Sequence, residues 1–312
     1  MQRYKNILLV RGHEQALERA AALAKHNRAR LTVVDVVEHL SREARSRSDE
    51  LSTSKSAEQL LLKQRRQQLE EYVAPLREQD LRVRTKVLVG KAFLQIIREV
   101  VRRGHDLVIV TAEGKGGLKE QLFGSTSLHL MRKCPCPVWV IKPSRSKRYV
   151  RILAAIDPDT FDDTTALLNR KIMDLATSLA DRESAALDIV SVWSFPGEAF
   201  LRSTAGTTKK TMQRLLREER AANQQRVDQL LELYPLENIS FEVHLVKGDP
   251  KKTIPDVVRN VQPNVIVMGT VCRTGVGGLL IGNTAETILQ RVDCSVLAVK
   301  PDGFVTPVSL KD

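Results

Sequence analysis

Aromatic side chains are scarce in this chain. Phenylalanine, tyrosine and tryptophan together make up 4% of its 312 residues, whereas 42% of the residues are hydrophobic. The interior must therefore be built mainly from aliphatic side chains, which suits parallel strands that are buried on both faces. The shortage of aromatic rings also leaves little to stack against nucleic-acid bases.

The chain also lacks a long apolar run. No stretch is long and apolar enough to span a bilayer, and the first apolar run, residues 7–10, is followed at once by charge. This start is typical of a strand rather than of a signal peptide. We therefore expect a cytoplasmic protein with no transmembrane segment.

Cysteine is rare, and the patterns that mark metal or catalytic sites are missing. Cys134 and Cys136 form a CxC pair, while Cys272 and Cys294 stand alone. No CxxC motif is present, and the six histidines show no metal-ligand spacing. We expect buried, reduced thiols, with redox chemistry at the CxC pair as the weaker alternative. Without a nucleophile elbow, a Ser-His-Asp set or a Walker lysine, we expect no catalytic set.

The formal net charge of +12 raises the question of a nucleic-acid partner. Most of the basic residues are spread over helical segments, as expected of solvated faces. One tight cluster lies at an apparent linker between two halves of the chain, and it comprises Lys142, Arg145, Lys147, Arg148 and Arg151. With no aromatic residues interleaved, the pattern favours solvated surfaces over nucleic-acid binding.

Apolar strand patterns and helical stripes alternate along the whole chain. This order predicts an α/β fold with parallel, doubly wound sheets and helices on both faces. The length suits about two domains. The expected strands are residues 7–10, 31–37, 81–89, 107–110 and 138–141 in the first half, and 152–156, 187–192, 239–245, 265–268 and 296–299 in the second. A helix is expected at 254–261, behind Pro250, and residues 194–212 are expected to be a longer, less regular insertion.

The two halves are copies of one unit. Gly124 and Cys136 recur as Gly282 and Cys294, each 158 residues later, and the first strands recur at an offset of 145. The difference between the offsets places an insertion, residues 194–212, within the second copy. We predict a first domain at 1–143, a linker at 144–149, a second domain at 150–304 and a tail at 305–312.

A glycine-rich loop follows the fourth strand of each copy. In the second copy Gly269 ends the strand, and Gly282-Asn283-Thr284 stands where a helix should begin. A strand, a glycine loop and a helix N-terminus can together hold a phosphate. The same glycines can instead make a simple tight turn. A second candidate phosphate site lies at the matching residues of the first copy, which are Thr111, Gly114, Gly124, Ser125 and Thr126.

These residues resemble the motif of the universal stress protein family, which is a glycine, two residues, a glycine, nine residues, then glycine with serine or threonine. The resemblance covers about residues 5–308. It implies a five-stranded, Rossmann-like parallel sheet in each unit, and ATP binding in some members. It also implies that an aspartate after the first strand meets the nucleoside. The candidate site of the second copy is therefore Asp157, Val192, Gly269, Cys272, Gly282, Asn283 and Thr284.

Neither copy matches the motif in full. In the second copy Cys272 replaces a glycine, and if this position needs a positive φ, its Cβ costs roughly 1–2 kcal/mol. Asn283 replaces serine or threonine. In the first copy Thr111 replaces the first glycine, and Gly12 stands where the second copy has Asp157. The acidic residues Asp159, Asp162 and Asp163 fit either a magnesium ion beside a triphosphate or the start of a helix.

The resemblance implies a tandem protein that binds ATP or a related nucleotide, with magnesium, and that takes part in stress responses with at most weak turnover. Two alternatives stay open. One is an interaction scaffold with degenerate pockets, and the other is a small-ligand or lipid sensor that uses residues 194–212. The two domains are expected to pair about a pseudo-twofold axis, with residues 138–141 against 296–299. A homodimer and protein partners remain open.

Overall fold

The structure is a computed structural model, and its described part divides into two compact units. The first unit contains the described residues up to 146 together with 304–310, and the second contains those between 148 and 303. In the helix that begins at residue 51, the structure describes side chains from residue 58 onward. The described residues are 4–38, 51–112, 123–144, 146, 148–158, 163–203, 208–270 and 282–310.

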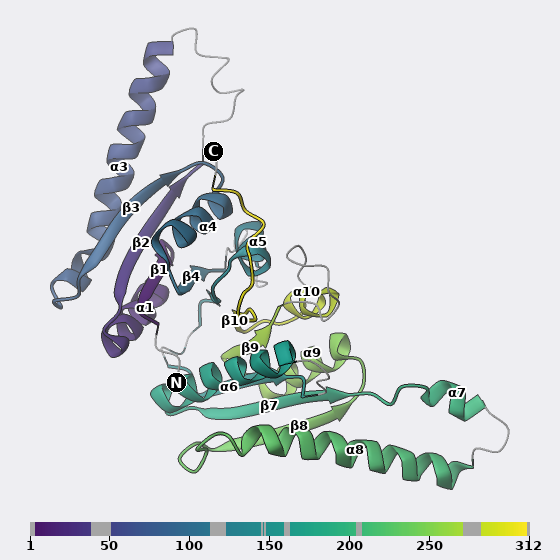
Figure 1. Cartoon of the computed structure of the whole chain (residues 1–312). Coiled ribbons are helices and arrows are strands. Elements are labelled where there is room, and N and C mark those ends of the chain that lie inside the picture. Colours follow the sequence, from purple (N-terminus) through teal and green to yellow (C-terminus); the bar gives the residue numbers. More distant parts are fainter. Residues whose placement is uncertain are drawn as a thin grey trace. The chain divides into compact units, whose positions relative to one another are not determined.

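The first unit is a five-stranded parallel sheet in the order β3-β2-β1-β4-β5. The chain moves outward from β1 to β3 and then returns to the other side of β1 (Figure 1), so the switch point lies between β1 and β4. Its elements are β1 (Asn6–Val10), α1 (Glu14–Asn27), β2 (Arg30–Val37), α3 (Leu51–Arg77), β3 (Val83–Val89), α4 (Ala92–Arg103), β4 (Leu107–Thr111), α5 (Ser125–Lys133) and β5 (Val138–Ile141).

The second unit repeats this topology in the order β8-β7-β6-β9-β10, and its switch point lies between β6 and β9. The predicted α/β fold, with two tandem doubly wound five-stranded parallel sheets, is thus confirmed. The elements are β6 (Arg151–Ile156), α6 (Asp163–Glu183), β7 (Ala186–Trp193), α7 (Glu198–Ser203), α8 (Lys209–Leu231), β8 (Phe241–Lys247), α9 (Pro250–Val261), β9 (Val265–Gly269), α10 (Asn283–Leu289) and β10 (Ser295–Val299).

Aliphatic strands form the core of both units. β4 and β9 each have four consecutive buried residues, which is why their sequences read as continuous apolar runs. Fully burying one such side chain contributes about 1.5–3 kcal/mol. The outermost strand β3 instead alternates between half-buried and exposed residues over most of its length, as its sequence predicts.

Three elements of the second unit differ from the sequence-based expectation. α9 begins at Pro250 rather than near Ile254, because Asp249 caps it by accepting a hydrogen bond from the Lys251 N–H at 3.0 Å. β8 begins at Phe241 rather than Ile239. The insertion at 194–212 is more regular than expected, since it contains α7 and the first turn of α8.

The segment after the second unit lies on the first unit. The C-terminal strap (residues 304–310) is joined to α4 by two hydrogen bonds. Arg98 Nε donates to the Ser309 carbonyl and an Arg102 guanidinium N–H donates to the Leu310 carbonyl, both at 3.1 Å. Every second residue of the strap, from Phe304 to Val308, is half-buried. Figure 1 shows the strap in yellow as it passes α5 and ends near α4.

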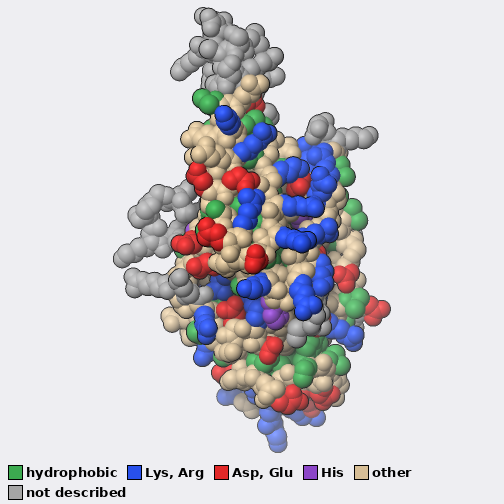
Figure 2. Space-filling view, turned by 90° about the vertical axis from the view of Figure 1, so that its left-hand side faces the viewer, with side chains coloured by type: hydrophobic (Ala, Val, Ile, Leu, Met, Phe, Trp, Pro, Cys, Tyr) green, Lys and Arg blue, Asp and Glu red, His purple; other side chains and the backbone are tan. Residues whose placement is uncertain are grey.

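Basic side chains are exposed over several elements of the first unit. β3 presents Arg84 and Lys86 on its exposed positions. Figure 2 looks onto the side of this unit where α3 and β3 lie, and Lys and Arg are more numerous there than Asp and Glu. None of the described helices is long and apolar enough to cross a membrane.

The cysteines within the described ranges are buried. Cys134, Cys136 and Cys294 form no disulfide, and the Sγ atoms of Cys134 and Cys136 lie 3.6 Å apart. The hydrogen bond between the two thiols, together with burial, favours the protonated form of Cys136 and raises the pKa of its thiol. A raised pKa leaves little thiolate, which favours packing over redox chemistry. Cys272 lies outside the described residues.

Candidate nucleotide-binding site

A cavity of about 750 Å³ opens at the switch point of the second unit, beyond the carboxyl ends of β6, β7 and β9. Ligands of doubly wound sheets bind at this place, and the volume suits a small organic ligand. The cavity brings together six of the seven residues proposed from the sequence, while Cys272 lies outside the described residues. The six are Asp157, Val192, Gly269, Gly282, Asn283 and Thr284.

Asp157 follows β6, and its main chain is held by Asn169 of α6. The Asp157 N–H donates to Asn169 Oδ1 at 2.9 Å, and Asn169 Nδ2 donates to the Asp157 carbonyl at 2.6 Å. Asn169 is 3% exposed and also lines the cavity. The two hydrogen bonds fix the main chain from which the Asp157 side chain projects. No sequence pattern predicts this role, because a single asparagine within a helix has many uses.

Gly269 ends β9 and lies under α6. A Cβ at this position would lie 2.8 Å from Leu168 Cδ2, closer than real Cβ contacts allow without movement. This glycine therefore has a packing reason that is independent of any ligand. α6 thus lies close to the end of β9, and residues of both elements line the cavity.

Gly282 is the N-cap of α10, and its N–H donates to the Thr270 carbonyl at 3.1 Å. Its φ of −59° is accessible to any residue, so backbone conformation does not require glycine there. The cap makes no side-chain hydrogen bond. Asn283 and Thr284 follow as the first two helical residues. Because α10 has only seven residues, we expect local N–H groups, rather than a large helix dipole, to attract an anion.

The cavity includes polar residues that the sequence analysis missed. Lys251, in the first turn of α9, brings a positive charge to the lining. Asn223 of α8 is buried, and its Nδ2 donates to the Glu219 carbonyl and carboxylate at 2.9 and 3.0 Å. The run Gly248-Asp249-Pro250 has the form of a helix start and could have pointed to Lys251. Nothing comparable marks Asn223.

The corresponding point of the first unit is occupied differently. A Cβ at Gly12 would lie 2.3 Å from Thr111 Cγ2, so the threonine side chain fills this space. Beside it, the Arg11 guanidinium donates to Asp35 Oδ2 at 3.0 Å and to Gln68 Oε1 at 3.3 Å. An internal ion pair therefore stands near the position where the second unit has Asp157.

The other proposed residues of the first unit lie at the start of α5. Gly124 is its N-cap, again without a side-chain hydrogen bond, and Ser125 and Thr126 are its first helical residues. Gly114 lies outside the described residues. In the second unit Asp163 begins α6, as the helix-start interpretation predicts, while Asp159 and Asp162 also lie outside the described part.

The fold and the cavity define a class of protein, a duplicated doubly wound α/β protein with a ligand-sized cavity at the switch point of its second copy. The sequence model of the universal stress protein family matches residues 4–142 and 148–300. The chain therefore belongs to the universal stress protein family.

Individual relatives agree with this membership. Over 236 residues the chain is 30% identical to universal stress protein E of Escherichia coli K12, covering 72% of this chain and 69% of that protein. Universal stress protein E of Photorhabdus laumondii is 25% identical over 99% of this chain and 98% of its own. The crystal structure of a functionally unknown Pseudomonas aeruginosa PAO1 protein has a TM-score of 0.69 at 25% identity, covering 96% and 94%.

Proposed function

We propose that the second unit binds ATP or a related nucleotide as part of a stress response, and that the first unit has a structural role. The observation that carries this proposal is the cavity at the switch point between β6 and β9, which Asp157, Gly282 and Lys251 all line. A carboxylate suits ribose hydroxyls, and a lysine with nearby N–H groups suits phosphates. We assign no catalytic residue.

Different residues of the cavity are proposed to bind different parts of the nucleotide. Asp157, fixed through Asn169, accepts hydrogen bonds from the nucleoside. The main-chain N–H groups of Asn283 and Thr284, at the start of α10, donate to phosphate oxygens. Lys251 supplies charge to the phosphates, so affinity should rise from adenosine through AMP and ADP to ATP. Magnesium would accompany the triphosphate.

Calorimetric titration of the full chain with adenosine, AMP, ADP and Mg-ATP tests the proposal. We expect Asp157→Ala to weaken all four ligands, and Lys251→Ala to weaken ATP much more than adenosine. Each loss should exceed about tenfold, the equivalent of roughly 1.4 kcal/mol. Matched controls are the exposed Asp293→Ala and Lys252→Ala, which lie outside the cavity lining and should bind as the parent does. Absence of binding to the parent chain at millimolar ATP would reject the proposal.

A small-ligand or lipid sensor remains the second candidate, and one observation favours it. Phe200 on α7 is 72% exposed, and α7 has no buried residue, although it lies in the insertion that follows the cavity residues Trp193 and Ser194. Native mass spectrometry of protein purified from cells separates the candidates. A retained nucleotide supports the first and a retained lipid the second, while an empty chain favours an interaction scaffold.

A further inference from the structure

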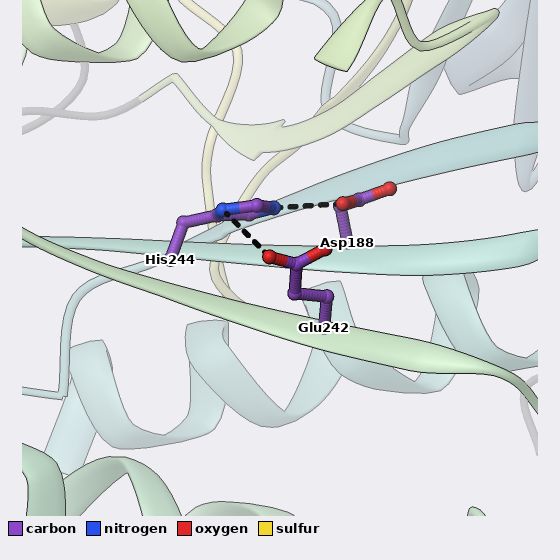
Figure 3. A group of neighbouring side chains, drawn as sticks. All are labelled: Asp188, Glu242 and His244. Carbon is purple, nitrogen blue, oxygen red and sulfur yellow. Dashed lines mark hydrogen bonds and ion pairs between the residues drawn. The ribbon is translucent and has the colours of Figure 1, made fainter. Parts of the chain in front are cut away.

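Three titratable side chains meet on one face of the second sheet, at a place separate from the cavity. Asp188 of β7 and Glu242 of β8 are register partners, and His244 follows two residues later on β8. All three therefore point to the same face, and Figure 3 shows them converging there. Asp188 precedes the cavity residue Val192 by four positions, or about 13 Å along an extended strand.

The three side chains are graded from buried to exposed. The side chain of Asp188 is 2% exposed, that of His244 20%, and that of Glu242 70%. His244 Nε2 lies 2.7 Å from Asp188 Oδ1, and His244 Nδ1 lies 3.9 Å from the nearer Glu242 oxygen. One ligand atom from each residue can be chosen so that all three lie within 4.8 Å of one another. The buried Asp188 side chain is therefore held in place, whereas the exposed Glu242 side chain can rotate.

Arg151 of β6 holds the second oxygen of the buried carboxylate. Its guanidinium lies 3.4 Å from Asp188 Oδ2, on the oxygen that does not face the histidine. Asp188 therefore presents only Oδ1 toward His244. Groups that hold a ligand side chain from behind in this way fix its orientation at metal sites.

We propose that Asp188, Glu242 and His244 bind a divalent transition-metal ion of the zinc type. One imidazole nitrogen with two carboxylate oxygens is a ligand set that such ions accept, with water completing the coordination. Bonds of about 2.0–2.2 Å in a tetrahedral site separate the ligand atoms by roughly 3.4 Å. Asp188 and His244 need only a small separation to reach this, and the exposed Glu242 closes toward Nε2 by rotating its side chain.

The first unit lacks these ligands. At the offset of 158, Glu242 corresponds to Arg84 and His244 to Lys86 on β3, neither of which binds cations at neutral pH. The proposal therefore predicts one ion per chain rather than two, although the two folds are copies.

The test is titration of the full, tag-free chain with Zn²⁺ by calorimetry, in the presence of a competing chelator. We expect one bound ion per chain for the parent, no measurable site for His244→Ala, and affinity lowered more than about tenfold for Glu242→Gln. Glu242 is exposed, so this variant should fold normally. Matched controls are Glu237→Gln, exposed in the same unit, and His26→Ala, exposed in the first unit.

Co²⁺ gives an independent readout, because its visible absorption reports the geometry and ligands of the site. The His244→Ala variant should lose the bands that the parent shows. The competing explanation is that His244 and Arg151 only hold the buried Asp188 carboxylate in place through their hydrogen bonds. In that case the variants lower stability while Zn²⁺ stoichiometry and Co²⁺ absorption do not change, and the proposal is overturned. It is overturned equally if the parent binds no Zn²⁺. ATP titrations are unaffected either way, so this test is independent of the nucleotide site.

Discussion

Gly12 and Thr111 share one space at the switch point of the first unit, since a Cβ at Gly12 would lie 2.3 Å from Thr111 Cγ2. The repeat offsets of 145 and 158 match these positions to Asp157 and Gly269 in the second unit. The first copy therefore has glycine at the first position and a side chain at the second, whereas the second copy has the reverse arrangement. Because a side chain at one position excludes one at the other in the first unit, a carboxylate matching Asp157 cannot be introduced there by one substitution without displacing Thr111.

Gly12→Asp should destabilise the first unit by about 1–3 kcal/mol, because the new side chain overpacks against Thr111. Adding Thr111→Gly should recover much of that loss, since the pair then matches the second unit. Urea unfolding of both single variants and the double variant gives the coupling energy. If the two single effects simply add, the proposed exchange of space is wrong.

Gly269→Ala tests whether this glycine serves packing or ligand binding. Its Cβ would lie 2.8 Å from Leu168 Cδ2. Because that atom ends a flexible side chain, we expect a modest loss of about 1 kcal/mol in the free energy of unfolding. Leu168→Ala, measured alone and in combination, should show a favourable coupling with it. ATP titration of Gly269→Ala then separates the roles, since an unchanged affinity assigns the glycine to packing alone.

His105 should make the first unit sensitive to acid. Burial lowers its pKa from the ordinary 6.5, although the Asn6 carbonyl and the charges of Glu99 and Asp106 act in the opposite direction. Nδ1 lies 3.3 Å from the Asn6 carbonyl oxygen, and the buried Nε2 has no hydrogen-bond partner within the described residues. The folded state thus binds the proton less tightly than the unfolded state. Stability is fully present above pH 6.5 and falls as the pH drops toward the folded-state pKa, below which it levels off.

Urea unfolding between pH 7.5 and pH 5 measures this dependence. His105→Asn should flatten it, and the exposed His26→Asn serves as the control. The slope should shrink rather than vanish, because burial also lowers the pKa values of His13 and His129. An unchanged slope in His105→Asn would contradict the assignment.

The pairing of β5 with β10 stays a prediction from the sequence. Each strand lies at the edge of its own sheet and is buried along its whole length, over Val138–Ile141 and Ser295–Val299. The family resemblance implies that such strands pair. A crystal structure of the full chain tests this directly. Strands that lie far apart in it would refute the intramolecular pairing.

Removal of the C-terminal strap should weaken the first unit selectively. A chain ending at Gly303 loses the carbonyls that accept from Arg98 and Arg102, and it uncovers the surface under Phe304. We expect a loss of roughly 1–2 kcal/mol and faster amide exchange in α4. Amide exchange in α9, its counterpart, provides the internal control. Equal protection of α4 in both chains would show that the strap contributes nothing.

The fold could be predicted because its signals are local. Buried strands such as β4 read as apolar runs, and β3 alternates because one of its faces is wetter. The expected start of α9 at Ile254 lies too far along the chain. The apolar stripe begins at Ile254, whereas the N-cap is Asp249. Hydrophobic periodicity therefore locates helices and strands more reliably than it locates their first and last residues.

The candidate site was predictable only where a motif marks it. Gly269, Gly282 and Asp157 stand at motif positions, and they do line one cavity. Asn169 and Lys251 line the cavity because α6 passes, and α9 begins, near the strand ends. The helix-start pattern at residues 248–250 points to Lys251, whereas no local pattern points to Asn169. Asp188 and His244 lie 56 residues apart, so spacing rules for metal ligands could not pair them. Their meeting depends on strand register, which is a property of the assembled sheet.

The strap also has a consequence for the order of events during synthesis. Residues 304–310 leave the ribosome only after all of the second unit, which is roughly 160 residues later than β5. At a synthesis rate of about 5–20 residues per second, roughly 10–30 s pass between the synthesis of the first unit and that of the strap that contacts α4. During that interval the Ser309 and Leu310 carbonyls are not yet present to accept from Arg98 and Arg102. A chaperone or a neighbouring nascent chain can therefore contact α4 before the strap does.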